Sequence, residues 1–219
     1  MISSQIGSLD RILSDGIKNG MITEISGLRG TGKTHLALQF AIEPLSKNER
    51  VFFIDTTVEF RPERFLEILQ SRNLSNELMK NLNVSHVTNI QQQIDILSNI
   101  ENQDLSILII DNISDLFSFE FTDKQQLMNK NNYFSAYILH LSRISLLKNI
   151  PIVITNQVLN KNENYYRRMD DLLENHIHQR IELEKIKNKY FGIIKSPFVD
   201  QQSFDYKITK LGIEETQSI

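Results

Sequence analysis

The sequence contains no cysteine among its 219 residues. Disulfide bonds and metal sites built on thiolates are therefore excluded. An excess of positive charge is also missing, because the formal net charge at pH 7 is −3. This balance disfavours a protein that coats nucleic acid through a uniformly basic surface, so any contact with nucleic acid must come from a local patch.

Long apolar runs are missing as well. No stretch approaches the roughly 20 residues that a membrane-spanning helix needs, and the segment Met1–Gly7 lacks the basic and apolar build of a signal peptide. We therefore expect a cytoplasmic protein with no membrane partner. Neither an internal repeat nor a linker divides the chain, so residues 1–219 are interpreted as a single α/β domain.

Segments with the pattern of strands alternate with segments that have the pattern of amphipathic helices. The strand candidates are Met21–Ser26, Val51–Asp55, Val84–Val87, Leu105–Asp111, Ile152–Thr155, Ile177–Leu183, Tyr190–Ile194 and Phe204–Ile208, and the helix candidates are His35–Ala41, Pro62–Gln70, Ser75–Asn81, Ile90–Ile100 and Tyr133–Lys148. This alternation predicts a mostly parallel central sheet flanked by helices, with antiparallel strands at the C-terminal end. The polar segment Leu159–Glu174 is expected to be a long mobile loop.

Gly27–Thr34 is the most informative stretch of the sequence. It fits G-x-x-x-x-G-K-[ST], a loop that binds phosphate between a strand and a helix. Its glycines allow a tight curl in which successive N–H groups converge on one anion, and the N-terminus of the following helix adds a favourable dipole. The residues expected to bind nucleotide here are Gly27, Arg29, Gly30, Thr31, Gly32, Lys33, Thr34 and His35.

A phosphate-binding loop of this type requires a second acidic residue, which helps to hold Mg²⁺. Asp111 ends the most apolar strand candidate and is the expected Walker B aspartate. Thr34 and Asp111 are thus the predicted Mg²⁺ ligands, and Lys33 is placed for the β- and γ-phosphates of ATP. Asp55 follows another apolar strand in a similar way, and we interpret it as structural rather than catalytic.

Several further segments together resemble the core of the RecA/RadA recombinase family. They are Ile22–Gly27, Ile54–Thr56, Phe60–Arg64 and Ile154–Val158, with Ser8–Ile17 and Ser196–Pro197 at the two ends. The resemblance covers nearly the whole chain, which begins at the core and is in this respect similar to archaeal RadB-type paralogues. It implies a RecA-type P-loop NTPase fold and an ATP-binding accessory protein of recombination and DNA repair. The implied partner is a RadA-type recombinase or another recombinase paralogue.

The resemblance also implies roles for single residues. Arg64 would lie against the adenine, Gln157 would report the γ-phosphate to the DNA loops, and Arg180 would match an arginine that follows the second DNA loop. Each has a plainer alternative: a solvated charge on a helix for Arg64, a strand cap for Gln157 and an exposed strand residue for Arg180.

One departure from the family concerns catalysis. Active members carry Ile-Asp-Thr-Glu-Gly, whose glutamate activates water, but Ile54–Phe60 reads Ile-Asp-Thr-Thr-Val-Glu-Phe and places Thr57 at that position. Glu59 lies two residues further on. Because a positioned general base is worth about 10²–10⁴-fold in rate, we expect nucleotide binding with slow hydrolysis, at most a weak DNA-dependent ATPase. A second departure, the lack of the linker motif that precedes the family core, predicts no extended self-filament.

A basic and aromatic segment follows Val158, where the family places its second DNA-binding loop. Arginine neutralises phosphates and tyrosine rings offer stacking surfaces for single-stranded bases. The DNA-binding residues expected there are Lys161, Tyr165, Tyr166, Arg167 and Arg168. The aromatic stretch Phe117–Phe121 lies where the first DNA loop should begin, although it could equally be a partner surface or a packed lid.

Two other functions remain open at this point. One is an interaction scaffold that keeps ATP as a structural ligand and never contacts DNA. The other is a KaiC-like signalling ATPase, which shares the phosphate-binding core. The Phe60–Arg64 and Thr155–Val158 segments favour the recombinase branch over the signalling ATPase.

Overall fold

The computed structural model describes residues 1–120, 127–161, 164–167, 169–197 and 199–216. Its helices are α1 (Gly7–Ile12), α2 (Lys33–Ser46), α3 (Pro62–Ser71), the 3₁₀ helix η1 (Asn76–Asn81), α4 (Ile90–Glu101), α5 (Asp115–Glu120), α6 (Leu127–Lys148) and α7 (Asp170–Leu173). Its strands are β1 (Ile22–Gly27), β2 (Val51–Asp55), β3 (Leu82–His86), β4 (Ile107–Asp111), β5 (Ile152–Lys161), β6 (Asn164–Arg167), β7 (Gln179–Ile186), β8 (Lys189–Ser196), β9 (Val199–Thr209) and β10 (Gly212–Glu215). In the part of the chain that these ranges cover, no helix is both long enough and apolar enough to cross a membrane.

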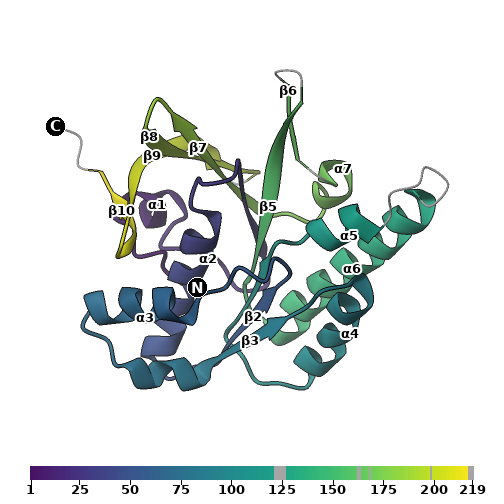
Figure 1. Cartoon of the computed structure of the whole chain (residues 1–219), viewed down its shortest axis with the longest axis horizontal. Coiled ribbons are helices and arrows are strands. Elements are labelled where there is room, and N and C mark those ends of the chain that lie inside the picture. The colour runs from purple at the N-terminus through teal and green to yellow at the C-terminus, as the bar shows by residue number, and fades with distance from the viewer. Residues whose placement is uncertain (121–126, 162–163, 168, 198, 217–219) are drawn as a thin grey trace.

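One sheet organises the molecule, with strand order β10-β9-β8-β7-β1-β5-β4-β2-β3. The strands from β7 to β3 in this order run parallel to one another. The β7–β8, β8–β9 and β9–β10 pairs are antiparallel. This arrangement, seen edge-on in Figure 1, confirms the α/β fold with antiparallel strands at the C-terminal end.

Helices cover both faces of the sheet, and each face has its own apolar core. Along β2, Phe53 packs with α1, α2 and α3, while Phe52 and Ile54 pack with α4, α5 and α6. Successive residues of a strand point to opposite faces, so a central strand buried on both sides reads as a continuous apolar run. The two helical layers lie on opposite sides of the sheet in Figure 1.

The predicted mobile loop at Leu159–Glu174 is wrong for the residues that the structure describes. β5 continues to Lys161, and β6 returns antiparallel with Val158 opposite Arg167. Polar sequence does not prevent a hairpin, because its ladder pairs backbone groups whatever the side chains are. Residues 162–163 and 168 lie outside the described part of the chain.

Strand β1 lies between the two strands that carry hairpins. Gly27, at its end, is the register partner of Gln157 on β5 and of Leu183 on β7. Both neighbouring strands continue beyond that point, to Lys161 and Ile186. The β5–β6 and β7–β8 hairpins therefore project past the sheet on either side of the loop that follows β1 (Figure 1).

The C-terminal strands hold helix α2 in place. The Gln39 Nε2 group donates to Ser4 O at 3.2 Å and to Ile213 O at 3.1 Å, and its Oε1 accepts from Ile213 N at 2.6 Å. The Tyr206 hydroxyl donates to Thr31 O at 2.6 Å. The phosphate-binding loop and the helix that follows it are thus bonded to segments near both ends of the described chain.

Candidate nucleotide site

The loop after β1 has a backbone conformation that requires glycine at two positions. Gly32 has φ +94° and directly precedes α2, in the left-handed region that favours glycine. At Gly27, an added Cβ would lie 2.4 Å from Leu183 O, so only glycine fits beside β7. These two positions explain why the loop can curl closely around the start of the helix.

Lys33 extends into this curl. Its Nζ donates to Gly27 O at 3.1 Å and to Leu28 O at 3.0 Å. Burial lowers the pKa of Lys33, and the nearby carboxylate of Asp111 opposes part of that shift. The ammonium group is therefore held in a confined position where a bound anion would stabilise its charge.

Asp111 lies next to the start of α2, as a Mg²⁺ site requires. The Thr34 hydroxyl donates to its Oδ2 at 2.6 Å, and the Thr155 hydroxyl donates to its Oδ1. Burial raises the pKa of Asp111, with the two hydroxyl bonds acting against that shift. A hydroxyl and a buried carboxylate side by side are oxygen ligands of the kind that Mg²⁺ prefers.

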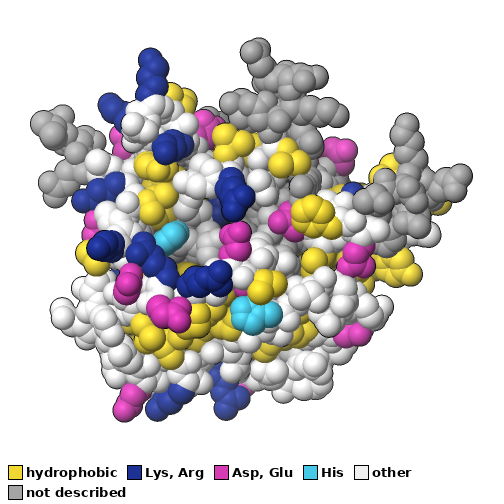
Figure 2. Space-filling model, viewed as in Figure 1, with side chains coloured by type: hydrophobic (Ala, Val, Ile, Leu, Met, Phe, Trp, Pro, Cys, Tyr) yellow, Lys and Arg dark blue, Asp and Glu magenta, His cyan; other side chains and the backbone are white. Residues whose placement is uncertain are grey.

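A cleft of about 710 Å³ opens beside these groups, within the size range of small-molecule sites. Its lining includes Arg29, Gly30, Gly32, Lys33, Thr34, His35, Thr57, Glu59, Arg64, Asp111, Asp115, Phe119 and Gln157. Figure 2 shows basic, acidic and histidine side chains close together around the centre of this face. Of the residues predicted to bind nucleotide, Gly27 and Thr31 are buried and absent from the lining.

Comparison with known proteins agrees with this geometry. Residues 1–216 match the protein family described as Rad51. The chain belongs to the Rad51 family. It is also 26% identical over 228 aligned residues to the DNA repair and recombination protein RadA of Aeropyrum pernix, an alignment that covers 96% of this chain and 72% of RadA.

The turn after β2 differs from the catalytic sequence of the Rad51 family, and Asp55 organises it. Its Oδ1 accepts from Thr57 N at 2.9 Å and from the Thr57 hydroxyl at 2.8 Å, and its Oδ2 accepts from Phe60 N at 2.9 Å. His86 Nδ1 lies 3.0 Å from the same Oδ2. Burial acts to raise the pKa of Asp55, but these hydrogen bonds outweigh it and the pKa is lowered.

This turn presents no well-placed base at the two positions that the sequence suggested. The Thr57 hydroxyl is bonded to Asp55 and has no proton-accepting strength comparable to a carboxylate. Glu59 is 68% exposed and pairs with Arg29 at 3.5 Å. Between them, Val58 has φ +56° at the position of the family glycine, a conformation that costs energy for a β-branched residue.

Arg64 and Gln157 both line the cleft, as the resemblance implies for nucleotide-sensing residues. Arg64 donates from Nε to His35 Nε2 at 3.2 Å and from Nη2 to Thr209 O at 2.6 Å. Burial, and then the charge of Arg64, lower the pKa of His35. The contacts to adenine and γ-phosphate that we expect of Arg64 and Gln157 stay predictions.

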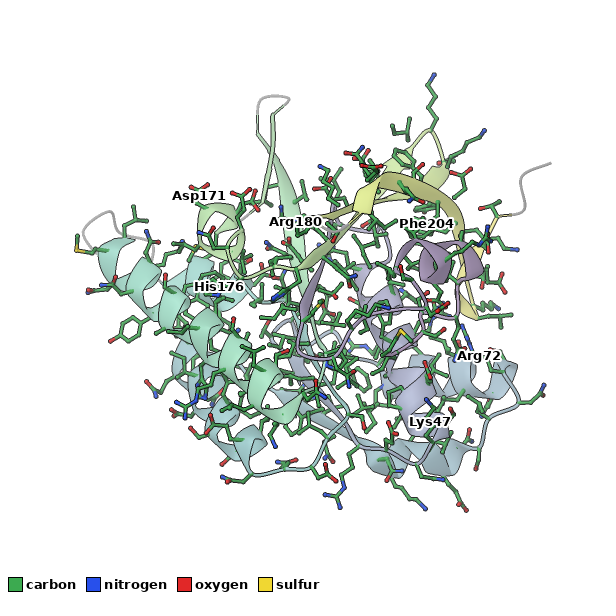
Figure 3. All side chains as sticks on the ribbon, turned by 180° about the vertical axis from the view of Figure 1, so that it is seen from behind. Lys47, Arg72, Asp171, His176, Arg180 and Phe204 are labelled. Carbon is green, nitrogen blue, oxygen red and sulfur yellow. The ribbon has the colours of Figure 1, made fainter. Side chains whose placement is uncertain are left out.

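Arg180 lies on β7, in a polar network around the buried Glu24. It donates to Glu24 Oε2 at 2.5 Å and to Asp170 Oδ1 at 3.0 Å. Glu24 is fully buried and also accepts from Asn156 Nδ2 at 3.0 Å. Figure 3 shows Arg180 close to α7, beside the central strands. The guanidinium is already bonded to two carboxylates, and a DNA contact for it stays a prediction.

The two predicted DNA segments are described only in part. Lys161 and the stretch from Tyr165 to Arg167 lie on the β5–β6 hairpin, whose side chains, like the whole of Arg168, fall outside the described part of the structure. In the aromatic stretch, Phe117 is buried against Phe134, with ring centroids 5.0 Å apart. Phe119 is 65% exposed at the cleft, and Phe121 is outside the described residues.

Sequence reasoning missed two residues of the site. Thr155 bonds the Walker B carboxylate, and its place at the end of an apolar strand beside Gln157 was a usable signal. Asp115, the first residue of α5, also lines the cleft. Its spacing from Asp111 gave no signal, because the turn between β4 and α5 decides where it lies.

Proposed function

We propose that this Rad51-family chain binds ATP with Mg²⁺ in the cleft and acts in recombination and DNA repair. The observation that carries the proposal is the joint placement of Lys33, Thr34 and Asp111 around one loop. Membership of the family supports the biological role, and the resemblance to RadB-type paralogues supports an accessory role beside a RadA-type recombinase or another recombinase paralogue.

The residues present fit ATP and Mg²⁺. The loop amides and Lys33 would hold the phosphates, while Thr34 and Asp111 would hold the metal, whose charge stabilises the phosphate oxygens. Gln157 lies on β5 opposite Gly27, at the end of β1, where it would face the γ-phosphate. Arg64 and His35 form the side of the cleft on which the adenine ring would lie.

Turnover is expected to be slow, well below the common enzyme median of about 10 s⁻¹. Thr57, at the position where the family would supply a base, is bonded to Asp55, and Glu59 two residues further on is exposed. This is the observation that favours an accessory role over a motor.

Nucleotide binding is tested by the stability that ATP·Mg²⁺ adds to the folded chain. At a ligand concentration of about 100 Kd, binding should add about 2.7 kcal/mol to the free energy of unfolding. Lys33→Ala should remove this gain. Lys47→Ala is the matched control, since Lys47 lies beyond the opposite end of α2 and pairs with Glu43 at the surface. If ATP·Mg²⁺ does not raise the free energy of unfolding of the wild-type protein, the proposal is contradicted.

Weak binding of single-stranded DNA is the second part of the proposal. If Lys161, Arg167 and Arg168 each neutralise one phosphate, the log–log salt dependence of binding should have a slope of about −2, from roughly 0.7 per phosphate. Fluorescence anisotropy across a salt series, with and without ATP, measures it. Arg167→Ala with Arg168→Ala should flatten the slope. No binding at low salt would leave the interaction scaffold as the function.

A further inference from the structure

Three elements meet at Arg64, on the side of the cleft where the adenine ring would lie. Arg64 on α3 donates from Nε to His35 Nε2 on α2 at 3.2 Å, and from Nη2 to Thr209 O at the end of β9 at 2.6 Å. Its Nη1 donates to Glu67 Oε2, on the same helix, at 3.2 Å. Each nitrogen of the guanidinium group therefore has its own acceptor.

These three acceptors differ in how firmly they hold the guanidinium group. The Glu67 side chain is 58% exposed, and an ion pair within one helix at the surface contributes little. His35 is partly buried, and Thr209 O belongs to the backbone where β9 ends. The orientation of the guanidinium plane is therefore fixed mainly by the acceptors from α2 and β9.

The bond from Arg64 determines which form of the His35 ring is present. A guanidinium group has donors and no acceptor, so Nε2 of His35 must carry the lone pair and the ring proton must be on Nδ1. A side chain without an acceptor at position 35 would leave one edge of the guanidinium group without its partner. His35 therefore influences the cleft through the acceptor that it offers.

The faces of the guanidinium group are left for a flat ligand, because the bonds to its acceptors run along the edges of its plane. Arg64 lines the cleft together with Leu38 and Phe60, whose side chains are largely buried. Arginine stacks its planar group on aromatic rings, and a group that is oriented before binding loses less entropy when the ligand arrives. A purine ring is a ligand of this kind.

The inference rests on the proposed binding of ATP. We propose that His35 is a positioning residue for recognition of the nucleotide base. By accepting from Arg64 Nε, it holds the guanidinium group in the orientation that stacks on the purine ring. A plainer role for His35, which follows Thr34 directly, is to shape the phosphate-binding loop. That role would affect every ligand with phosphates, whether or not the ligand carries a base.

The test compares the affinities of the full chain for ATP and for inorganic tripolyphosphate, each with Mg²⁺. Tripolyphosphate has the three phosphates and lacks the base. His35→Leu should weaken ATP binding by about three- to tenfold, the cost of ordering one long side chain on binding, and leave tripolyphosphate binding unchanged. His35→Gln keeps an acceptor at a similar reach and should restore the affinity for ATP.

A control and a double variant complete the test. His140→Leu is the matched control, since it makes the same change on α6, outside the cleft lining, where His140 pairs with Glu101. Arg64→Leu should weaken ATP binding, and adding His35→Leu to it should cost no further affinity. Residues that act as one unit give such non-additive losses.

Four outcomes would overturn the inference. Equal losses for ATP and tripolyphosphate in His35→Leu would show that His35 shapes the phosphate loop, and wild-type affinities would show that it has no role in binding. ATP binding as weak in His35→Gln as in His35→Leu would show that the acceptor is not what matters. Losses that multiply in the double variant would show that His35 acts independently of Arg64.

Failure of the proposed function would give a different result. A wild-type chain that binds neither ATP nor tripolyphosphate would contradict nucleotide binding itself. The inference fails only when the wild type binds and the variants depart from the expected pattern, so the two failures are distinguishable.

Discussion

Asp55 and Asp111 end neighbouring parallel strands and are register partners, yet their hydrogen-bond partners and the directions of their pKa shifts differ. Asp111 bonds two side-chain hydroxyls beside Lys33, and burial raises its pKa. Asp55 accepts two backbone N–H groups and one hydroxyl, and its pKa is lowered. An acid at the end of an apolar strand therefore has no fixed role.

The partners explain the difference. Hydroxyls rotate, so Thr34 and Thr155 can turn away and leave the Asp111 oxygens to a cation. The backbone N–H groups that bond Asp55 cannot turn away without unfolding the turn. The Asp55 carboxylate therefore stabilises the conformation of residues 55–60. We therefore assign Asp111 to the proposed ligand site and continue to interpret Asp55 as structural.

The sharpest test of this comparison exchanges each aspartate for asparagine. Asp55→Asn should lower the free energy of unfolding by about 3 kcal/mol, because hydrogen bonds to a charged group are worth roughly 1.5–3 kcal/mol each. Asp111→Asn should leave the fold as stable or more so, since folding disfavours its charge, but should abolish Mg²⁺-dependent nucleotide binding. Urea unfolding and nucleotide titration measure both. Loss of binding in Asp55→Asn together with loss of stability in Asp111→Asn would contradict the distinction between the two residues.

The second prediction concerns the turn that Asp55 holds. Thr57→Glu with Val58→Gly restores the Thr-Glu-Gly sequence of active family members. If the turn keeps its shape, ATP turnover should rise by about 10²-fold or more, the contribution of a positioned base. Steady-state phosphate release measures it, and Thr57→Gln with Val58→Gly is the control that cannot accept a proton. Equal rates in the two variants would refute the prediction.

The third prediction concerns the backbone of the same turn. Val58→Gly should stabilise the chain by about 1 kcal/mol, because a left-handed residue with a side chain is strained by roughly 1–2 kcal/mol and glycine is not. The midpoint of urea unfolding reports the change. Val58→Ala keeps the strain and should give little gain. A similar gain for alanine would assign the effect to side-chain bulk instead.

The smallest expected effect concerns pH and the α2 side of the cleft. The folded-state pKa of His35 lies below its ordinary value of 6.5, so the unfolded chain binds its proton more readily. Its contribution to stability is complete above pH 6.5 and is lost as the pH falls through the folded pKa. Asp55, whose pKa is also lowered, loses its contribution only below its ordinary value of 3.8.

His35→Gln should therefore flatten the pH dependence of stability just below pH 6.5 and leave the acid range unchanged. Thermal unfolding at a series of pH values checks this. A wild-type chain that becomes more stable as the pH falls from 6.5 would contradict the sign.

Much of the fold and part of the candidate site could be predicted from the sequence. Apolar strand runs and the Gly27–Thr34 motif carry strong local signals. The strand predicted to end at Asp111 is present as β4, and Asp111 accepts a hydrogen bond from the Thr34 hydroxyl. The β5–β6 hairpin was not predicted, because its pairing is made by backbone groups. The buried pair of Glu24 and Arg180 was not predicted either, since residues on two strands far apart in the sequence meet only in the folded sheet. For the same reason, the sequence did not predict Asp115 as a residue of the cleft.

The bond network around Gln39 has a consequence for the order in which the site can form. The loop and α2 are made early in synthesis, but Thr31 of the loop is bonded to Tyr206, and Gln39 of α2 is bonded to Ile213, far along the chain. Chains grow at about 5–20 residues per second. The strands that hold the phosphate-binding loop are therefore synthesised many seconds after the loop itself. A ribosome-bound fragment ending before β9 would carry the complete motif and lack the support that shapes it.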